Sequence, residues 1–175
     1  MKTIAILTSL LLTACSTLQS PFYIGERVPF EADDVGNETV WKVNDDLYHV
    51  RIVNTNLIVA ASLKWDEPTG SFQKKTQEVV VSKLNETLFV NLRKNDLYTV
   101  LRATPSDEFI VFYTAEDAEI KKHLGTRCIE SAEGDDTYVL QGTKKEIDAF
   151  VTEHLHVLFS QDAILIGELI SGELP

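Results

Sequence analysis

The side chains best suited to nucleophilic, acid–base or metal chemistry in this sequence are two cysteines and four histidines. They are Cys15, Cys128, His49, His123, His154 and His156. A nucleophilic enzyme needs a thiol or hydroxyl together with a histidine base and an orienting acid. The sequence has no G-x-S-x-G turn, and no cysteine-enzyme signature surrounds Cys128. We therefore predict no catalytic residue from local motifs, and an enzymatic site would have to be assembled from distant residues.

His154 and His156 suggest a metal site, since histidine is a common zinc ligand. Two side chains separated by two positions on a helix point about 200° apart, so they cannot share one ion. The surrounding pattern favours a helix with His154 inside its apolar stripe, where we expect a hydrogen-bonded packing residue. We expect His49 and His123 to be surface residues, and we predict no metal ion and no cofactor.

Acidic residues gather at three expected turns, which are Asp45-Asp46, Asp66-Glu67 and Asp135-Asp136. Calcium loops place Asp or Asn at alternate positions around a glycine and end on a distal Glu, and none of the three has this spacing. Glycine-rich loops that bind phosphate are missing as well. We interpret the acidic pairs as solvated turn residues.

Cys15 follows a segment with three parts. Lys2 supplies positive charge, an apolar run extends from Ile4 to Leu12, and the small residues Thr13-Ala14 precede the cysteine. This layout is typical of a secretory signal peptide. The apolar run is shorter than the roughly 20 residues that a membrane-spanning helix needs. The sequence therefore predicts export and cleavage rather than a membrane-spanning segment at the N-terminus.

The tetrapeptide Leu12-Thr13-Ala14-Cys15 resembles the lipobox of bacterial lipoprotein precursors. The resemblance implies that the Cys15 thiol receives a diacylglyceryl group, that the chain is cleaved before Cys15, and that the new amino group takes a fatty acyl chain such as palmitate. Ser16 follows the cysteine where inner-membrane lipoproteins typically have Asp, which implies the outer membrane. Orientation toward the periplasm or the exterior is left open. Cys128 would then have no disulfide partner within the chain, and we interpret it as a buried apolar residue.

Removing residues 1–14 leaves 161 residues, which suits one domain with a sizeable core. The mature chain carries 15 Lys and Arg against 27 Asp and Glu, a balance of −12. Such a surface repels nucleic acid and anionic lipid headgroups, so membrane attachment would depend on the acyl chains. Residues 15–36 contain two prolines and two glycines, and we predict a tether that reaches on the order of 70 Å when extended, with part of it packed. Residues 37–175 are predicted to form a single domain.

Short β-branched and aromatic runs separated by turn residues begin at Val40 and predict antiparallel strands. The expected strands are 39–43, 47–53, 57–65, 77–84, 88–93, 97–103, 109–114, 127–131, 137–141 and 163–169. The segment 72–88 is ambiguous, because its apolar residues also fit one face of a helix. A repeated Asp-Leu-Tyr-x-Val at 46–50 and 96–100 indicates either common turn-and-strand chemistry or a duplicated hairpin.

Capping boxes predict two helices. Thr143 with Glu146 opens a helix over about 143–159 that has a continuous apolar stripe, and Thr114 with Asp117 opens a short helix over about 115–124. The predicted fold class is α+β: an antiparallel sheet of six to eight strands with the long C-terminal helix and the short helix on one face. We expect Trp41 and Trp65 in the core between sheet and helix, with exposure in a partner groove as the alternative.

These observations predict a lipid-anchored outer-membrane lipoprotein of the cell envelope. We expect a non-enzymatic binding or assembly protein whose partners are the membrane and another envelope protein, and no nucleic acid. Two alternatives remain open. One is an envelope hydrolase with a site assembled from distant residues, and the other is a carrier whose curved sheet holds a small apolar molecule.

Overall fold

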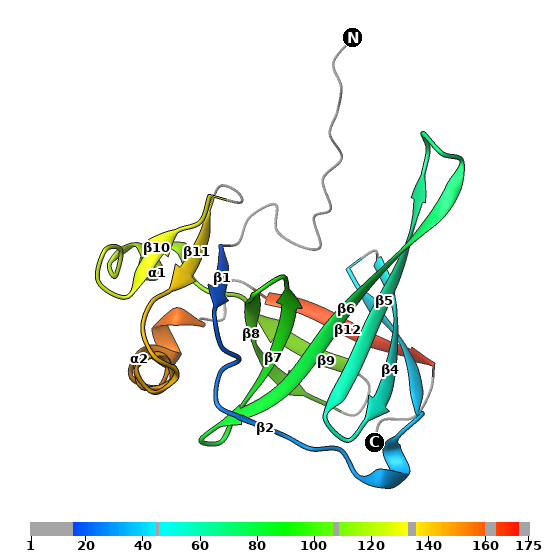
Figure 1. Cartoon of the computed structure of the whole chain (residues 1–175), viewed down its shortest axis with the longest axis horizontal. Coiled ribbons are helices and arrows are strands. Elements are labelled where there is room, and N and C mark those ends of the chain that lie inside the picture. The colour runs from blue at the N-terminus through cyan, green and yellow to red at the C-terminus, as the bar shows by residue number, and fades with distance from the viewer. Residues whose placement is uncertain (1–15, 45, 107–108, 133–135, 160–163, 172–175) are drawn as a thin grey trace.

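The computed structural model describes residues 16–44, 46–106, 109–132, 136–159 and 164–171 (Figure 1). Strands make up 56% of them. The strands are β1 (Thr17–Ser20), β2 (Glu26–Arg27), β3 (Glu38–Val43), β4 (Asp46–Asn54), β5 (Leu57–Asp66), β6 (Ser71–Leu84), β7 (Thr87–Lys94), β8 (Leu97–Pro105), β9 (Phe109–Tyr113), β10 (Cys128–Glu130), β11 (Thr137–Leu140) and β12 (Ile164–Ser171). The helices are η1 (Ala32–Asp34), α1 (Asp117–Lys121) and α2 (Lys144–Leu158).

Eight of the strands form a closed antiparallel barrel. The strands β3 to β9 each pair with the next strand along the chain, as a meander of hairpins does. The last strand, β12, closes the circle because one of its edges pairs with β9 and the other with β3. Gly167 shows this closure directly, since it lies opposite Ile110 on one side and Val43 on the other.

The predicted α+β fold class is therefore wrong: the protein is mostly β, and its principal sheet closes on itself. Hairpin signals in the sequence report only which strands are neighbours. Closure depends on the accumulated twist, tilt and stagger of eight strands, to which each strand makes a small contribution. The ambiguous segment 72–88 is mainly the long strand β6.

A second, smaller sheet branches from the barrel at β8. The first part of β8 pairs with β1, where Gln19 lies opposite Thr99, and its second part pairs with β9, where Tyr113 lies opposite Arg102. Beyond β1 the order continues through β11, which runs parallel to β1, to β10. Together with α1 and α2 this branch forms a flank beside the barrel (Figure 1).

The N-terminal part of the expected tether is built into this fold. Leu18 on β1 and Ile24 just before β2 are 1% and 0% exposed, and both belong to the core of the flank. Ser16 is buried as well, and its hydroxyl donates a hydrogen bond of 2.9 Å to Asp117 Oδ1. From Ser16 to Arg27, this stretch of chain packs on the barrel and the flank instead of acting as a free spacer.

The flank has a solid core in which α2 packs on β1, β10 and β11 and on the outer face of the barrel wall. Helix α2 begins with the expected capping box, because the Thr143 side chain accepts from Glu146 N and Glu146 caps Thr143 in return. The short helix expected over about 115–124 is shorter in the structure, because α1 begins only after Glu116 and ends at Lys121. The buried core residues include Tyr138, Leu140, Ile147, Phe150, Val151, Leu158 and Phe159.

The repeated Asp-Leu-Tyr-x-Val motif occupies the start of a strand in both copies, after an Asn with positive φ. Asn44 has φ 55° and Asn95 has φ 56°, which is the left-handed conformation that Asn tolerates in tight turns. The two tyrosines face opposite sides of the barrel wall, since Tyr48 lines the interior and Tyr98 packs edge-on against Tyr23 outside. The motif therefore reflects common turn chemistry and not a superposable duplication.

Candidate ligand-binding cavity

The interior of the barrel contains a cavity of about 400 Å³. Alternate residues of each strand point inward, and every strand from β3 to β9 contributes side chains to the lining. The lining residues on the strands are Thr39, Trp41, Val43, Tyr48, Val50, Ile52, Ile58, Ala60, Gln77, Val79, Val81, Leu88, Val90, Leu92, Leu101, Ala103, Pro105, Ile110 and Phe112. Phe30 and Asn37 complete the set.

Among the residues that the structure describes, the lining is almost wholly apolar and includes no charged side chain. Four polar side chains contribute to it, and they belong to Asn37, Thr39, Tyr48 and Gln77. Trp41 Nε1 donates to Thr39 Oγ1 over 2.8 Å, so the Thr39 hydroxyl is engaged in the wall. The Tyr48 hydroxyl lies 3.5 Å from Asp46 Oδ2. Burial and this neighbouring carboxylate raise the pKa of Tyr48, so the phenol is neutral at physiological pH.

Gln77 on β6 and Asn37 before β3 are the two amides of the lining. Asn37 is exposed, whereas Gln77 is half-buried and makes no side-chain hydrogen bond to any other residue that the structure describes. An amide of this kind offers both a donor and an acceptor without a charge. Gln77 is therefore the lining group best placed to orient a neutral ligand.

The cavity approaches the surface at the end of the barrel where β4 turns into β5 and β8 into β9. Asn37 and Pro105, the exposed members of the lining, both lie at this end. Phe30 lies across the same end, because its backbone N–H donates to Thr55 O over 2.9 Å and its ring packs against Ile52, Ile58 and Val79. We infer that a ligand would enter here, past Phe30.

Trp41 is buried as expected, at 7% exposure, but its surroundings differ from the prediction. Its ring lies in the barrel wall, near Phe112 and the position of Gly167, and not between a sheet and a helix. Gly167 leaves room for these rings, because an added Cβ would come within 3.1 Å of Phe112. The side chain of Trp65 lies outside the described residues.

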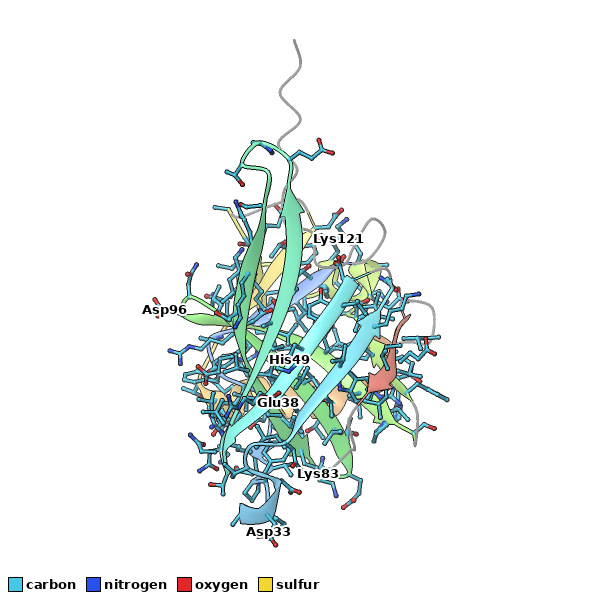
Figure 2. All side chains as sticks on the ribbon, turned by 90° about the vertical axis from the view of Figure 1, so that its right-hand side faces the viewer. Asp33, Glu38, His49, Lys83, Asp96 and Lys121 are labelled. Carbon is cyan, nitrogen blue, oxygen red and sulfur yellow. The ribbon has the colours of Figure 1, made fainter. Side chains whose placement is uncertain are left out.

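The single-residue predictions have mixed outcomes. Cys128 is fully buried, and burial raises the pKa of its thiol to about 11, as expected for an inert packing residue. The other cysteine of the chain, Cys15, lies outside the described residues, as do Asp45 and Asp135. His49 is on the outer surface, where its Nε2 lies 3.2 Å from Glu38 Oε2 (Figure 2).

His154 and His156 lie apart, as predicted, but His154 has a contact that the sequence did not predict. His156 is exposed and His154 is half-buried on another face of α2, so they do not meet. His154 instead contacts His123, with ring centroids 4.5 Å apart. His123 is thus not the ordinary surface residue that was expected, and no local signal in the sequence links two residues from different helical segments.

Comparisons with known proteins add no family assignment, because no family model, no curated protein and no solved structure matches this chain. Within the part of the chain that the structure describes, neither α1 nor α2 has the length and apolar character of a membrane-spanning helix. The functional inference therefore depends on the cavity and on the residues themselves.

Proposed function

We propose that this protein is a lipid-anchored lipoprotein of the bacterial outer membrane that binds one small, neutral, apolar molecule inside its barrel. The observation that carries the proposal is the cavity of about 400 Å³ with an uncharged, apolar wall. Protein interiors are normally packed as densely as organic crystals, so a space of this size in the centre of a domain calls for an explanation.

Size and shape support a ligand as that explanation. Small-molecule pockets commonly measure about 300–1,000 Å³ and have mostly apolar walls with a few polar groups. An eight-stranded barrel is wide enough either to be filled by its own side chains or to hold one small ligand. Several inner positions carry small side chains, as Ala60, Val79, Val90 and Ala103 illustrate, and the centre stays open.

The absence of charge among the described lining residues also favours an uncharged ligand. Burying a carboxylate or an ammonium without a partner costs several kcal/mol. The lining has no opposite charge to offer, whereas the Gln77 amide can exchange hydrogen bonds with a carbonyl or a hydroxyl. We therefore favour a neutral ligand that is largely hydrocarbon and carries one or two polar atoms.

The proposed anchor agrees with this role. If Cys15 carries acyl chains, the next residue, Ser16, is already part of the fold through Asp117 and its pairing with Ala115. The barrel would then sit close to the membrane, where apolar molecules are most concentrated. A hydrolase within the barrel is less well supported, because the lining brings together no acid, base and nucleophile among the described residues.

Binding can be measured with two fluorescent probes that share one scaffold. N-phenyl-1-naphthylamine is neutral, and 8-anilinonaphthalene-1-sulfonate carries a sulfonate. We expect the neutral probe to bind with one site per protein and the anionic probe to bind at least about 10-fold more weakly, because its charge would enter an unpartnered wall. Equal binding of both probes, or binding of neither, would contradict the proposal.

A filled cavity provides the matched variant. Ala103 is 5% exposed and lines the cavity, so Ala103→Phe should occupy part of the space and abolish binding of N-phenyl-1-naphthylamine. Ala149→Phe makes the same change at an exposed position of α2 and should leave binding unchanged. Circular dichroism of both variants shows whether the fold is retained.

The anchor is tested separately in cells. Labelled palmitate should be incorporated into the wild-type protein and not into Cys15→Ala, and the variant should keep its signal peptide. Cys128→Ala is the control and should be labelled and processed as the wild type is. Normal labelling of Cys15→Ala would reject the lipidation site while leaving the cavity proposal intact.

A further inference from the structure

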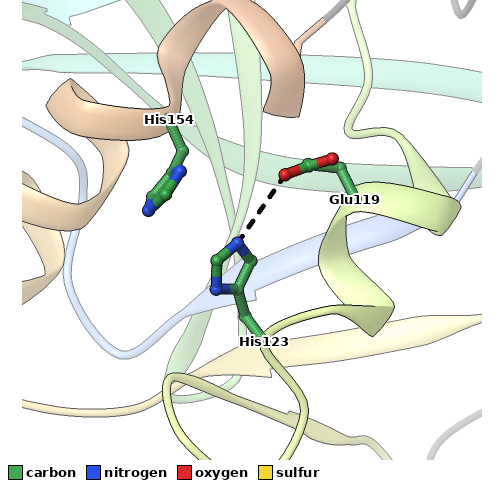
Figure 3. Close-up of side chains that lie close together, drawn as sticks. All are labelled: Glu119, His123 and His154. Atoms are coloured by element: carbon green, nitrogen blue, oxygen red, sulfur yellow. Dashed lines mark ion pairs between the residues drawn. The ribbon is translucent and has the colours of Figure 1, made fainter.

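Three potential metal ligands from separate parts of the sequence converge in the flank (Figure 3). Glu119 belongs to α1, His123 follows α1, and His154 belongs to α2. One ligand atom of each residue lies within 4.8 Å of the ligand atoms of the other two. No residue of this cluster contributes to the cavity.

Hydrogen bonding does not account for the buried ring nitrogen of His123. His123 Nε2 is buried and has no hydrogen-bond partner among the described residues. Glu119 Oε1 lies 3.7 Å from this nitrogen, which is too long for a hydrogen bond. A buried polar nitrogen without a partner destabilises the fold, and a bound cation would remove that cost.

The carboxylate is already oriented for coordination through one oxygen. Lys122 Nζ holds Glu119 Oε2 at 2.5 Å and leaves Oε1 toward His123. Outer partners of this kind fix the ligating group in many metal sites.

The surroundings combine shelter with access. Phe150 packs against both imidazoles, with ring centroids 4.9 Å from His123 and 4.7 Å from His154, and covers one side of the cluster. The side chains of Glu119, His123 and His154 are 16%, 21% and 25% exposed, so water and ions reach the other side. A half-buried position strengthens electrostatic attraction without closing the route to solvent.

We propose that Glu119, His123 and His154 form a binding site for a divalent transition-metal ion, of which Zn²⁺ is the best match. Two imidazoles and one carboxylate are a ligand set found in three-residue zinc sites, where water takes the fourth position. Tetrahedral bonds of about 2.1 Å separate neighbouring ligand atoms by about 3.4 Å, so small side-chain rotations close the present spacing. The ion would connect α1 and the residue that follows it to α2, and so stabilise the flank independently of any ligand in the barrel.

Metal binding is tested on the purified full-length mature protein, without a histidine tag and after removal of metals with a chelator. Calorimetric titration with ZnCl₂ should show one site per chain, and Co²⁺ should give the intense visible absorption of tetrahedral coordination. We expect His154→Ala and His123→Ala to weaken binding by more than about 100-fold, beyond the roughly 10–100-fold that loss of an outer partner alone costs. Glu119→Gln, which keeps size and shape, should weaken it as well.

The control is His156→Ala, which removes an exposed histidine from the same helix and should bind Zn²⁺ as the wild type does. The melting temperature should rise with Zn²⁺ in the wild type and in His156→Ala, and should not rise in the three cluster variants. If a histidine variant does not fold in chelator, Glu119→Gln still provides the comparison. No binding by the wild type, or equal loss of binding in His156→Ala, would overturn the proposal.

Discussion

One wall of this protein has a solid core on its outer face and a hollow on its inner face. On β7, Phe89 points outward and packs edge-on against Phe159, with ring centroids 5.7 Å apart, while the next residue, Val90, lines the cavity. The same alternation places Val80 and Val100 outside and Val79 and Leu101 inside. Neighbouring residues of one strand thus belong to two different interiors, the packed core of the flank and the lining of the barrel cavity.

The difference lies in what faces each side of the wall. Outside, α2 brings a stripe of Ile147, Phe150, Val151 and Leu158 onto the sheet, and these residues fill the space to 6% exposure or less. Inside, each strand faces only the opposite strands across the width of the barrel, and the side chains there do not reach the centre. Apolar alternation alone therefore does not produce a filled core.

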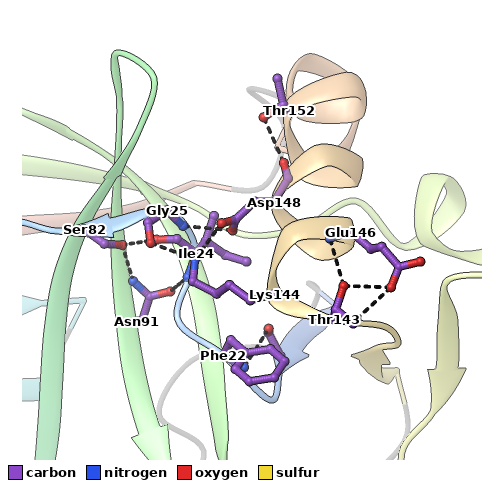
Figure 4. A network of polar contacts seen from close by, with 11 residues as sticks. Phe22, Ile24, Gly25, Ser82, Asn91, Thr143, Lys144, Glu146, Asp148 and Thr152 are labelled. Atoms are coloured by element: carbon purple, nitrogen blue, oxygen red, sulfur yellow. Dashed lines mark hydrogen bonds and ion pairs between the residues drawn. The ribbon is translucent and has the colours of Figure 1, made fainter.

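A buried polar network joins the two regions along the strap formed by residues 21–27 (Figure 4). Asn91 on the outer face of β7 accepts from Ile24 N over 3.0 Å and donates to Val80 O over 3.1 Å and to Ser82 Oγ over 2.8 Å. On the other side of the strap, Lys144 donates to Gly25 O over 2.7 Å. The network holds the N-terminal strap between the barrel and α2.

The largest effect should come from removing a side chain of the solid core. Ile147→Ala in α2 should lower the free energy of unfolding by about 4 kcal/mol, because the site is close-packed on all sides. Ile58→Ala in the barrel lining should lower it by about 2 kcal/mol, because this side chain already borders empty space. Urea denaturation measures both values. Equal losses would mean that the two interiors are packed alike.

The second prediction concerns the junction between the two regions. Asn91→Leu should lower the free energy of unfolding by about 2–3 kcal/mol, since Ile24 N–H and Val80 C=O lose their side-chain partner while remaining buried. Asn56→Leu, at an exposed turn, should change it by less than about 0.5 kcal/mol. Denaturation of the two variants side by side provides the test, and similar losses would argue against a structural role of the network.

The smallest effect should be electrostatic and should belong to the flank. Hydrogen bonds from Lys121 and Tyr138, at 2.6 Å each, lower the pKa of Asp117 below its unfolded value near 3.9. The stabilisation is therefore present above that value and is lost as the pH falls through the folded pKa. We expect Asp117→Asn to be less stable than the wild type by no more than about 1 kcal/mol at pH 7, because the carboxylate is partly exposed.

Unfolding curves at pH 7 and at pH 2 distinguish this explanation from a change in packing. The gap between wild type and Asp117→Asn should narrow as the pH falls from 7 to 2, because protonation of the folded-state carboxyl removes the charge-dependent part of the stabilisation. Asp33→Asn, at an exposed site in η1, serves as the control and should show little difference at either pH. A gap that stays constant with pH would rule out the carboxylate charge as its cause.

Much of the local structure could be read from the sequence. Asn44 and Asn95 mark the hairpin turns because Asn adopts positive φ at little cost, and alternation of apolar residues marks the strands between them. The capping box at Thr143 locates the start of α2 because its hydrogen bonds join residues three positions apart. The predicted signal peptide and the lipobox resemblance at Cys15 likewise depend only on contiguous residues, and they stay predictions.

The candidate sites could not be read in the same way. The cavity exists because β12 pairs with β3, a strand that is far from it in the sequence. No residue of either strand specifies that partner by itself. His123 and His154 come together because α1 and α2 pack on the same small sheet. The sequence offered only the pair His154 and His156 for comparison, and helix geometry excluded a shared ion for that pair.

The sequence by itself determined the elements of this protein, its strands, turns and main helix, because these depend on interactions between residues a few positions apart. Only the tertiary structure decided that the sheet closes, that its interior stays open and that Glu119 meets two histidines. Closure and convergence arise from the sum of strand twist, tilt and long-range pairing, and those quantities are properties of the assembled chain.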